Sequence, residues 1–354
     1  MSKPARETPA GRPGSMLVTG ASGIVGSELM AQARAQGWDV VGVGRRGDPA
    51  NGVLTWRMGA EPPPAEIDRP WDVVIHSAAD TRWNLPLAEA RSANLAPTEA
   101  LTTVVGRQTF VVHLSTFFAA GRTGTARSPA PEDYRNSYEW SKAAAERFVR
   151  DTFPRSVIVR PPMIIGRSTD GVITRFNGIY TVLGAATSGL LAVVVGDPDA
   201  RVELVPVDAT AALVLALARD RDDSVPVHVL GAGEECLTLR EIMEIGFSAL
   251  NAVRRAEGVE PVESPPFVGV DAWERFYLPF SQPHLNERQR LTIDILDAFR
   301  PYFAESITQN ITDKVTDVGP AVDTAVRWWA RRRSRIALRS PWRWSLGSTG
   351  NGPL

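Results

Sequence analysis

Residues 16–26 read MLVTGASGIVG, and this stretch decides the fold of the chain. A short apolar run is followed by glycines at 20, 23 and 26. The first glycine permits a sharp turn, the second lets the backbone approach a phosphate, and the third lets a helix pack closely on a strand. The amino end of a helix offers free N–H groups and a positive dipole to an anion. We therefore expect a strand, a turn and a helix that bind a dinucleotide; the alternative is a purely structural turn.

The rest of the chain continues this alternation of short β-rich runs with longer segments of helical period. The expected strands are 16–19, 39–43, 71–76, 109–114, 156–160 and 227–230. The expected helices are 26–36, 86–106, 138–151, 237–250 and 286–313, and 205–218 should hold a short strand and a helix. Strands that alternate with helices indicate βαβ units and a parallel sheet. The expected fold is α/β: a doubly wound parallel (Rossmann) sheet with a smaller, mostly helical C-terminal substrate domain.

The same pattern suggests a division of the chain into four parts. These are a disordered leader (1–14), a Rossmann NADP-binding domain (15–165 plus 205–235), a substrate-binding lid (166–204 plus 236–325) and a basic, Trp/Arg-rich tail (326–354). The leader is rich in Pro, Arg and small residues and lacks the apolar stretch of a signal peptide.

Composition excludes several classes of function. The 354 residues carry a net charge of −1, so nothing draws the whole chain toward nucleic acid. A single cysteine, Cys236, rules out a disulfide framework and a cysteine-based zinc site, and we expect it to be structural. The four histidines are scattered, so we expect no metal. No apolar run is long enough for a transmembrane helix, and a cytoplasmic location is the expectation.

The end of the second expected strand bears on the choice of dinucleotide. NAD sites place an acid there for the ribose 2′-hydroxyl, whereas NADP sites use arginine for the 2′-phosphate. In this chain Gly44 stands at the acidic position and Arg45-Arg46 follow at once. A guanidinium binds phosphate through paired, charge-assisted hydrogen bonds. The pattern favours NADP(H) over NAD(H), unless both arginines are ordinary surface residues.

A tyrosine and a lysine stand four residues apart in the expected helix 138–151. Residues at i and i+4 share one helical face, so Tyr138 and Lys142 can address the same small space. A neighbouring ammonium favours the phenolate form, so we expect Lys142 to lower the pKa of Tyr138. Such a pair can meet the negative charge that develops on a carbonyl oxygen during reduction. The alternative is a solvated helix with an incidental tyrosine and lysine.

Several motifs in this order resemble the extended short-chain dehydrogenase/reductase superfamily over residues 15–235. TGASGIVG resembles its glycine turn, HSAA at 76–79 its cofactor wall, NLAPTEAL at 94–101 its helix asparagine, and RPP at 160–162 the turn beside the nicotinamide. The resemblance implies catalytic roles for Thr116, Tyr138 and Lys142. It implies cofactor contacts for Gly20, Ser22, Gly23, Ile24, Gly26, Arg45, Arg46, Ala78, Ala79, Asn94, Lys142 and Pro161. One departure is that Met58-Gly59-Ala60 stands where the family has an aspartate, which leaves recognition of the adenine ring open.

Within the superfamily, 160–180 and 202–216 are similar to the thioester-reductase and fatty acyl-CoA reductase (male-sterility) branch. That likeness implies NADPH-dependent reduction of a carrier- or CoA-bound acyl thioester to an aldehyde. The substrate pocket implied has apolar walls and comprises Ser115, Phe117, Phe118, Met163 and Phe176.

Other activities on the same fold remain open. Sugar-nucleotide dehydratases place an acid pair directly after the threonine, and Phe117-Phe118 at that place disfavour dehydration. Epimerases of sugar nucleotides need no such pair and stay an alternative. So do reductases or dehydrogenases of free ketones and alcohols. A non-catalytic NADP-binding protein is disfavoured because both Tyr138 and Lys142 are present.

The segment 327–344, RWWARRRSRIALRSPWRW, holds many arginines and tryptophans and no acid. It could contact an acidic carrier protein through Trp328, Trp329 and Arg331 to Arg333, or an anionic membrane surface. The alternative is an amphipathic terminal helix. The resemblance also allows a homodimer.

Overall fold

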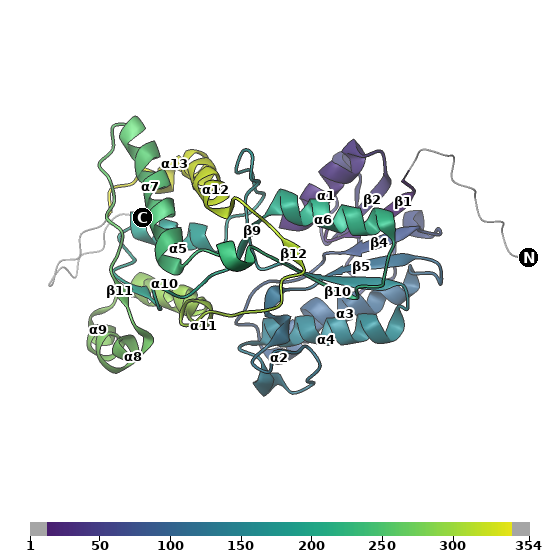
Figure 1. Ribbon diagram of the computed structural model, residues 1–354, viewed down its shortest axis with the longest axis horizontal. Helices are drawn as coiled ribbons and strands as arrows, with labels where there is room; N and C mark the ends of the chain where they lie inside the picture. Colours follow the sequence, from purple (N-terminus) through teal and green to yellow (C-terminus); the bar gives the residue numbers. More distant parts are fainter. Residues whose placement is uncertain (1–12, 342–354) are drawn as a thin grey trace, which may run out of the picture.

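The structure is a computed structural model that describes residues 13–341. Of the expected leader, residues 1–12 lie outside the described residues, and of the expected tail, residues 342–354 do. The described chain forms two parts, a layered α/β part and a mostly helical lid beside it (Figure 1).

The α/β part is built on one eight-stranded sheet whose paired strands all run parallel. In spatial order its strands are β12 (Asp313–Lys314), β10 (Val227–Gly231), β6 (Ser156–Arg160), β5 (Phe110–Leu114), β4 (Val73–His76), β1 (Ser15–Thr19), β2 (Asp39–Gly44) and β3 (Val53–Thr55). The direction of winding reverses between β1 and β4, and ligands of such sheets bind at the carboxyl ends of the strands near this point. The predicted doubly wound parallel sheet is therefore confirmed.

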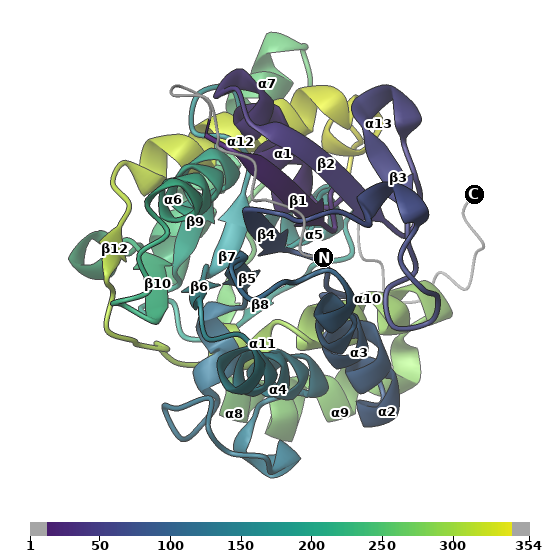
Figure 2. The same cartoon turned by 90° about the vertical axis from the view of Figure 1, so that its right-hand side faces the viewer.

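Helices cover both faces of the sheet (Figure 2). On one face α1 (Ile24–Ala35) packs beside α6 (Val207–Asp220), and their apolar residues share a core with the strands. The other face is covered by α2 (Leu87–Ala90), α3 (Ala96–Glu99) and α4 (Ser137–Thr152). The central strands are apolar on both faces because neither face meets water.

The helical character predicted over 86–106 is confirmed for Leu87–Thr103, but the helix is not a regular α-helix. The chain forms α2, a π-helical segment over Arg91–Leu95, α3 and a 3₁₀ turn that ends at Thr103. Pro97 has no N–H to donate, so the regular hydrogen-bond pattern cannot run through it. The wider π-turn directly before it carries Asn94. Such π-turns occur frequently at functional sites.

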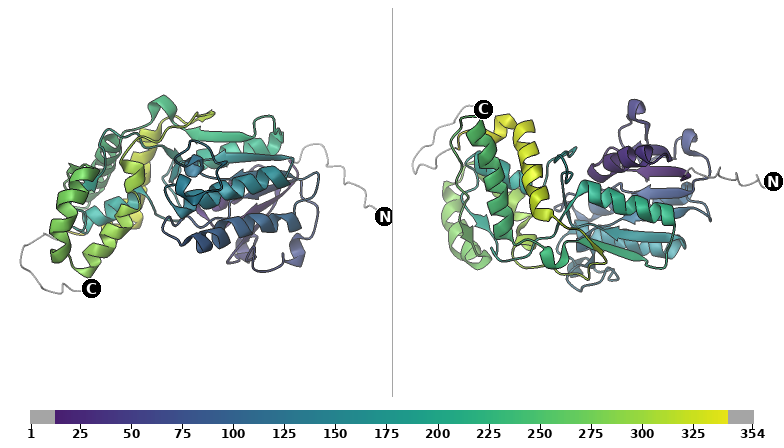
Figure 3. Two further views of the ribbon diagram at one scale, coloured as in Figure 1. Left: turned by 90° about the horizontal axis from the view of Figure 1, so that it is seen from below. Right: turned by 45° about the horizontal axis from the view of Figure 1, so that its top comes forward.

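The lid comprises a helical core and two short parallel strand pairs. Its helices are α5 (Ile179–Thr187), α7 (Leu239–Ala256), α8 (Val270–Ala272), α9 (Leu278–Ser281), α10 (Glu287–Asp297), α11 (Arg300–Phe303), α12 (Val318–Arg332) and α13 (Ser334–Ala337). Its strands pair as β7 (Met163–Ile165) with β9 (Leu204–Pro206) and β8 (Val194–Val195) with β11 (Phe267–Val268). A capping box of Thr238 and Glu241 begins α7, and α12 packs along α7 (Figure 3).

Two features differ from the expected organisation of the C-terminal half. The predicted helix over 286–313 is wrong beyond Phe303, because the chain runs without helix to β12, which pairs with β10 at the edge of the sheet. β-branched residues such as Ile307, Thr308 and Ile311 in that stretch favour extended structure. The expected start of the tail at residue 326 falls inside α12, so 326–332 continue a helix of the lid core.

Among residues 13–341, no helix is both long enough and apolar enough to cross a bilayer.

Candidate active site

The glycine turn after β1 is shaped by lack of room for side chains. Gly20 has φ +67°, and a Cβ there would lie 2.6 Å from the backbone nitrogen of Ala78. A Cβ on Gly26 would lie 2.1 Å from the carbonyl oxygen of Gly20. Gly23 caps α1 without a side-chain hydrogen bond, so its first N–H groups point at no side chain. This arrangement fits a pyrophosphate, which accepts hydrogen bonds from such groups.

The end of β2 lies beside this turn. A Cβ on Gly44 would lie 3.1 Å from the hydroxyl of Ser22, so Ser22 points toward the start of the Arg45-Arg46 pair. Both arginines are exposed. The charge of Arg45 contributes to a lowered pKa of Asp80, behind the larger effect of the hydrogen bonds from Arg82. Arg45 therefore lies close enough to the loop after β4 for the two to flank one site.

Asn94 connects that loop to the helix that carries Tyr138. Its Oδ1 accepts a hydrogen bond from the backbone N–H of Asp80 at 2.7 Å, and its Nδ2 donates to the hydroxyl of Ser141 at 2.9 Å. Asn94 is buried, as is Ser141. The predicted cofactor contact thus lies within a network that fixes the loop Ala78–Asp80 relative to α4.

The three predicted catalytic residues meet at the carboxyl end of β5. Thr116 is the second residue after this strand, and its hydroxyl forms a hydrogen bond with Tyr138 on the first turn of α4. The Nζ of Lys142 donates to the carbonyl oxygen of Leu114, the last residue of β5, at 2.7 Å. All three side chains are buried. Asn136 caps α4 by accepting a hydrogen bond from the N–H of Glu139, which fixes where the helix begins.

The predicted lowering of the pKa of Tyr138 is wrong for the structure without cofactor. Burial raises the pKa of Tyr138 to about 12, and the hydrogen bond from Thr116 acts in the opposite direction but is smaller. Burial also lowers the pKa of Lys142 to about 8, although the carboxylate of Glu146 opposes this. Low polarity disfavours the charged form of both groups, and this outweighs their proximity along the helix.

A buried ion pair joins β6 to α4, the helix that carries Tyr138 and Lys142. Arg160, at the end of β6, donates two hydrogen bonds to Glu146 on α4, at 2.8 and 2.6 Å. The next residue, Pro161, accepts a hydrogen bond from the N–H of Phe117 at 2.8 Å. The predicted turn at Pro161 is therefore held against the end of β5.

Four of the five predicted pocket residues gather beside Thr116. Phe117, Phe118 and Met163 line a cavity of about 10 Å³, and the hydroxyl of Ser115 is buried with no hydrogen-bond partner in the structure. Phe176 lies elsewhere, on the lid, where its ring packs edge-on against Tyr180 and under Arg333. Phe176 was expected in the pocket, but the structure places it in the lid core instead.

The cavity has a wall that the sequence did not reveal. Tyr302 of α11 lines it, and the hydroxyl of Tyr302 donates to the buried carboxylate of Glu139 at 2.8 Å. Tyr302 belongs to no motif and lies far along the chain from α4. The only signal that could have indicated the contact is Glu139 itself, an acid next to Tyr138 on a helix face that turns out to be buried.

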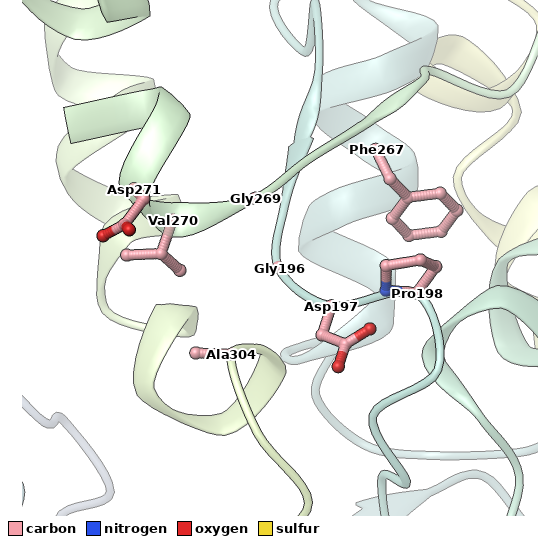
Figure 4. Close-up of a pocket in the computed structure, with 8 residues that line it drawn as sticks. All are labelled: Gly196, Asp197, Pro198, Phe267, Gly269, Val270, Asp271 and Ala304. Atoms are coloured by element: carbon pink, nitrogen blue, oxygen red, sulfur yellow. The ribbon is translucent and has the colours of Figure 1, made fainter. Parts of the chain in front are cut away.

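A larger groove of about 540 Å³ lies on the lid, and Figure 4 shows the residues that line it. Its walls are Gly196, Asp197, Pro198, Phe267, Gly269, Val270, Asp271 and Ala304. None of the predicted site residues is among them. The groove therefore does not hold the catalytic residues, although Ala304 places it directly behind α11.

Two further residues qualify the expectations. Cys236 is buried, and burial raises the pKa of its thiol to about 12, so it is a poor nucleophile. Trp329 is buried in the lid core, so the expected contact of this tryptophan with a partner is wrong. Within residues 13–341, no group of His, Cys, Asp and Glu is arranged to hold a metal ion.

Comparison with known proteins finds a matching family model and a similar curated protein. Residues 65–214 match the NAD-binding family described as male sterility protein. A fatty acyl-CoA reductase of Drosophila melanogaster, wat, is 25% identical over 218 residues, which are 50% of this chain and 42% of the relative. The chain thus spans less than half the length of that curated relative.

Solved structures match over nearly the whole chain. The terminal R domain of the myxalamid PKS-NRPS pathway is 16% identical, with a TM-score of 0.66 and 94% of each chain covered. A thiolation-reductase di-domain from an archaeal non-ribosomal peptide synthetase is 16% identical, with a TM-score of 0.60 and coverage of 92% and 78%. The NAD⁺ complex of WbmH from Bordetella bronchiseptica is 17% identical, with a TM-score of 0.62 and coverage of 90% and 99%.

At these identities the solved structures show the shared fold, and residues 65–214 match the model of the NAD-binding family described as male sterility protein. Residues 65–214 therefore resemble the NAD-binding domain of the male sterility proteins, on a fold that the chain shares with a reductase di-domain and with an NAD⁺-bound enzyme among the solved structures.

Proposed function

We propose that the chain reduces an acyl thioester, bound to a carrier protein or to coenzyme A, to an aldehyde with NADPH. The observation that carries this proposal is the meeting of Thr116, Tyr138 and Lys142 at the end of β5, with an apolar wall directly beside them. The names of the fatty acyl-CoA reductase and of the thiolation-reductase di-domain among the similar proteins support a reduction of this kind.

The residues present fit a dinucleotide. The glycine turn leaves no room for side chains and offers free N–H groups to a pyrophosphate, Arg45 and Arg46 stand ready for a 2′-phosphate, and Lys142 lies where it can hold the nicotinamide ribose. When bound there, NADPH supplies the hydride for the carbonyl carbon. The carboxyl ends of β1, β4 and β5 are the proposed place for both cofactor and substrate.

Tyr138 and Thr116 act on the carbonyl oxygen. As that oxygen gains negative charge, a prepositioned donor stabilises it. Because burial raises the pKa of Tyr138 to about 12, its hydroxyl already carries a proton at neutral pH and can donate it in a hydrogen bond. Thr116 adds a second hydroxyl on the same side. A pKa of about 8 leaves Lys142 mostly protonated at neutral pH, so a positive charge lies behind the pair.

A thioester carbonyl that accepts hydride becomes a hemithioacetal, which breaks its C–S bond to give an aldehyde and a thiol. The proton on the carbonyl oxygen is returned as the C=O bond re-forms, and the leaving thiolate takes up a proton. No enzyme-bound thioester is needed in this scheme. This agrees with the raised pKa of Cys236 and its place outside the cavity beside Thr116.

The proposed partner is an acidic carrier protein, and the lid offers a surface for it. Arg331, Arg332, Arg333, Arg335 and Arg339 are all exposed at the end of α12 and around α13. The segment 331–341 contains no acidic residue. Opposite charges steer such partners together. The tryptophan contact is not part of the proposal, because Trp329 is buried.

The test is NADPH oxidation, followed by absorbance, with acyl-CoA and acyl-pantetheine thioesters and with the matching free aldehydes and ketones. Tyr138→Phe removes the proposed donor, and Tyr277→Phe serves as control because Tyr277 is half exposed on the lid. We expect thioester turnover with aldehyde as product, reduced by about 10²–10³ in Tyr138→Phe and unchanged in Tyr277→Phe.

Turnover of free aldehydes or ketones alone would contradict the thioester proposal and favour the reductases and dehydrogenases of free ketones and alcohols. Tight NADPH binding without turnover of any of these would contradict it as well, and would direct attention to sugar nucleotides.

A further inference from the structure

Tyr302 is a lid residue that contacts the α/β part of the molecule beside the catalytic residues. Its ring, which is 2% exposed, packs against Phe118 and Trp83, with ring centroids 4.5 and 4.4 Å apart. Phe118 follows the catalytic strand β5, and Trp83 lies in the loop after β4. An aromatic residue of the lid therefore occupies the space between two loops that border the proposed site.

The hydroxyl of Tyr302 is fully engaged. It donates to Oε1 of Glu139 at 2.8 Å and accepts from Nδ2 of Asn136 at 2.7 Å. The other oxygen of Glu139 accepts from the backbone N–H of Arg135 at 3.1 Å and from its guanidinium at 3.4 Å. Because Glu139 is completely buried, moving Tyr302 away would leave a buried carboxylate short of a partner.

The segment that carries Tyr302 is also fixed on its other side. The carbonyl oxygen of Phe303 accepts a hydrogen bond from the N–H of Asp197 at 2.8 Å. At the neighbouring Gly196 a Cβ would lie only 2.6 Å from that same oxygen, so the two backbones are in close contact. The groove of Figure 4 begins behind this contact, at Ala304. α11 thus contacts α4 through Tyr302 and the lid segment Gly196–Asp197 through Phe303.

The space beside Phe117 and Phe118, the two residues that follow Thr116, is very small. The cavity there is lined by Phe117, Phe118, Met163 and Tyr302 together with Arg201, Val202, Glu203 and Ile307, and it measures about 10 Å³, roughly the room needed for one water molecule. A substituent larger than a methyl group on the reacting carbon therefore has to displace Tyr302 to occupy it.

From this geometry we propose that Tyr302 is a specificity-determining residue, which restricts the substrate to acyl groups with short apolar chains. The proposal rests on the proposed thioester reduction for its substrate class. Glu139 and Asn136 are positioning residues in it, because they hold the Tyr302 ring in the pocket and do not touch the substrate.

The experiment compares two-carbon and eight-carbon acyl-pantetheine thioesters, and the aldehydes of the same lengths, in the wild type, Tyr302→Ala and Tyr302→Phe. We expect the wild type to prefer the two-carbon substrates. Tyr302→Ala should raise kcat/KM for the eight-carbon substrates by at least about tenfold, since single methylene groups in apolar pockets already discriminate by this much. Tyr302→Phe retains the ring and should keep the short-chain preference in weakened form. Tyr277→Ala, at a half-exposed lid position, is the matched control.

A Tyr302→Ala variant that binds NADPH normally and keeps the wild-type chain-length profile would overturn the proposal. Turnover of aldehydes without thioesters would refute the proposed function, and the aldehyde series would then decide on Tyr302. If no substrate were turned over, hydrogen exchange in the NADPH complex would test whether Tyr302 anchors α11 to α4. Tyr302→Phe, unlike Tyr277→Phe, should speed exchange in peptides 299–303 and 135–140, and unchanged exchange there would refute the anchoring.

Discussion

Tyr138 and Lys142 lie one helical turn apart, yet burial favours the neutral form of each. The pKa of the tyrosine rises to about 12, and that of the lysine falls from 10.5 to about 8. At neutral pH the site therefore holds a protonated phenol beside an ammonium that is costly to bury. For reduction this is a suitable state, because the oxygen that gains charge needs a donor and a nearby positive charge.

Burying the ammonium of Lys142 should lower the free energy of unfolding of the wild type relative to a variant with a neutral side chain at position 142. Because the folded pKa lies below the unfolded one, the unfolded chain binds more protons between about pH 8 and 10.5, and this group makes stability rise with pH across that window. Below about pH 8 the folded chain bears the full cost. Each pKa unit corresponds to about 1.4 kcal/mol, and the lost hydrogen bond to Leu114 offsets part of the gain in a variant.

We therefore expect Lys142→Met to equal or exceed the wild type in free energy of unfolding at neutral pH, by up to about 2 kcal/mol, while turnover falls by at least about a hundredfold. The difference in stability should shrink toward about pH 10. Urea unfolding without cofactor at both pH values measures this. A variant less stable than the wild type by more than about 1 kcal/mol at neutral pH would contradict it.

Arg45 and Arg46 should decide between NADPH and NADH. Replacing either by alanine removes a charge from the proposed 2′-phosphate site and leaves the glycine turn intact, so NADPH affinity should fall by about tenfold or more while NADH affinity stays within about twofold. Arg57→Ala, an exposed arginine beyond β3, is the control. Isothermal titration with both cofactors measures the ratio, and equal losses for both cofactors would rule out 2′-phosphate recognition by these residues.

At the scale of elements, the turn between β1 and α1 depends on the absence of side chains. The Cβ of an alanine at position 26 would lie 2.1 Å from the carbonyl oxygen of Gly20, a contact that no side-chain movement can relieve. Backbone would have to shift in the segment that carries the proposed pyrophosphate site.

Gly26→Ala should accordingly abolish NADPH binding and destabilise the fold by about 1–3 kcal/mol. Gly37→Ala is the matched control, because Gly37 also has a positive φ (+82°) but a Cβ there meets nothing within 4 Å. We expect that variant to lose about 1 kcal/mol of stability and to bind NADPH normally. Fluorescence titration and thermal unfolding check both variants, and normal NADPH binding by Gly26→Ala would refute the proposed role of the turn.

The sequence indicated those elements whose residues carry a local signal. The glycine spacing and the apolar runs of β4, β5 and β6 predicted the turn and the strands correctly, and parallel strands bring their carboxyl ends together. The Tyr138/Lys142 spacing predicted correctly that the two residues share a helix, α4. No local signal marked β3 and β12, which are short edge strands defined by their partners. The Tyr302–Glu139 hydrogen bond joins residues 163 positions apart, and no pattern in either segment refers to the other.

At the scale of the whole molecule, the lid and the sheet are joined by contacts from several parts of the chain. β12 extends the sheet from within the C-terminal half, Ile24 of α1 packs against the lid core, and Tyr302 reaches α4. In the same lid, α12 buries its apolar face, including Trp329, and leaves its final arginines exposed. The basic surface is therefore presented by a firmly packed helix, although its sequence resembles a detached tail.

Such a surface should act on carrier-bound substrates alone. Arg331→Glu combined with Arg335→Glu reverses charge at two exposed positions, so we expect KM for an acyl thioester on an acidic carrier protein to rise by about tenfold or more. For the same acyl group on free pantetheine, kcat/KM should stay within about twofold, since no charged partner has to dock. Raising the salt concentration should narrow the difference in KM for the carrier-bound substrate between wild type and variant, because exposed charges are screened.

The control is Arg107→Glu with Arg219→Glu, two exposed arginines near the amino ends of the strands, at the opposite edge of the sheet from the proposed site. If this control raised KM for the carrier as much as the lid variant does, net charge and not the surface at the end of α12 would govern the encounter. If neither variant altered KM, the carrier would dock elsewhere on the molecule.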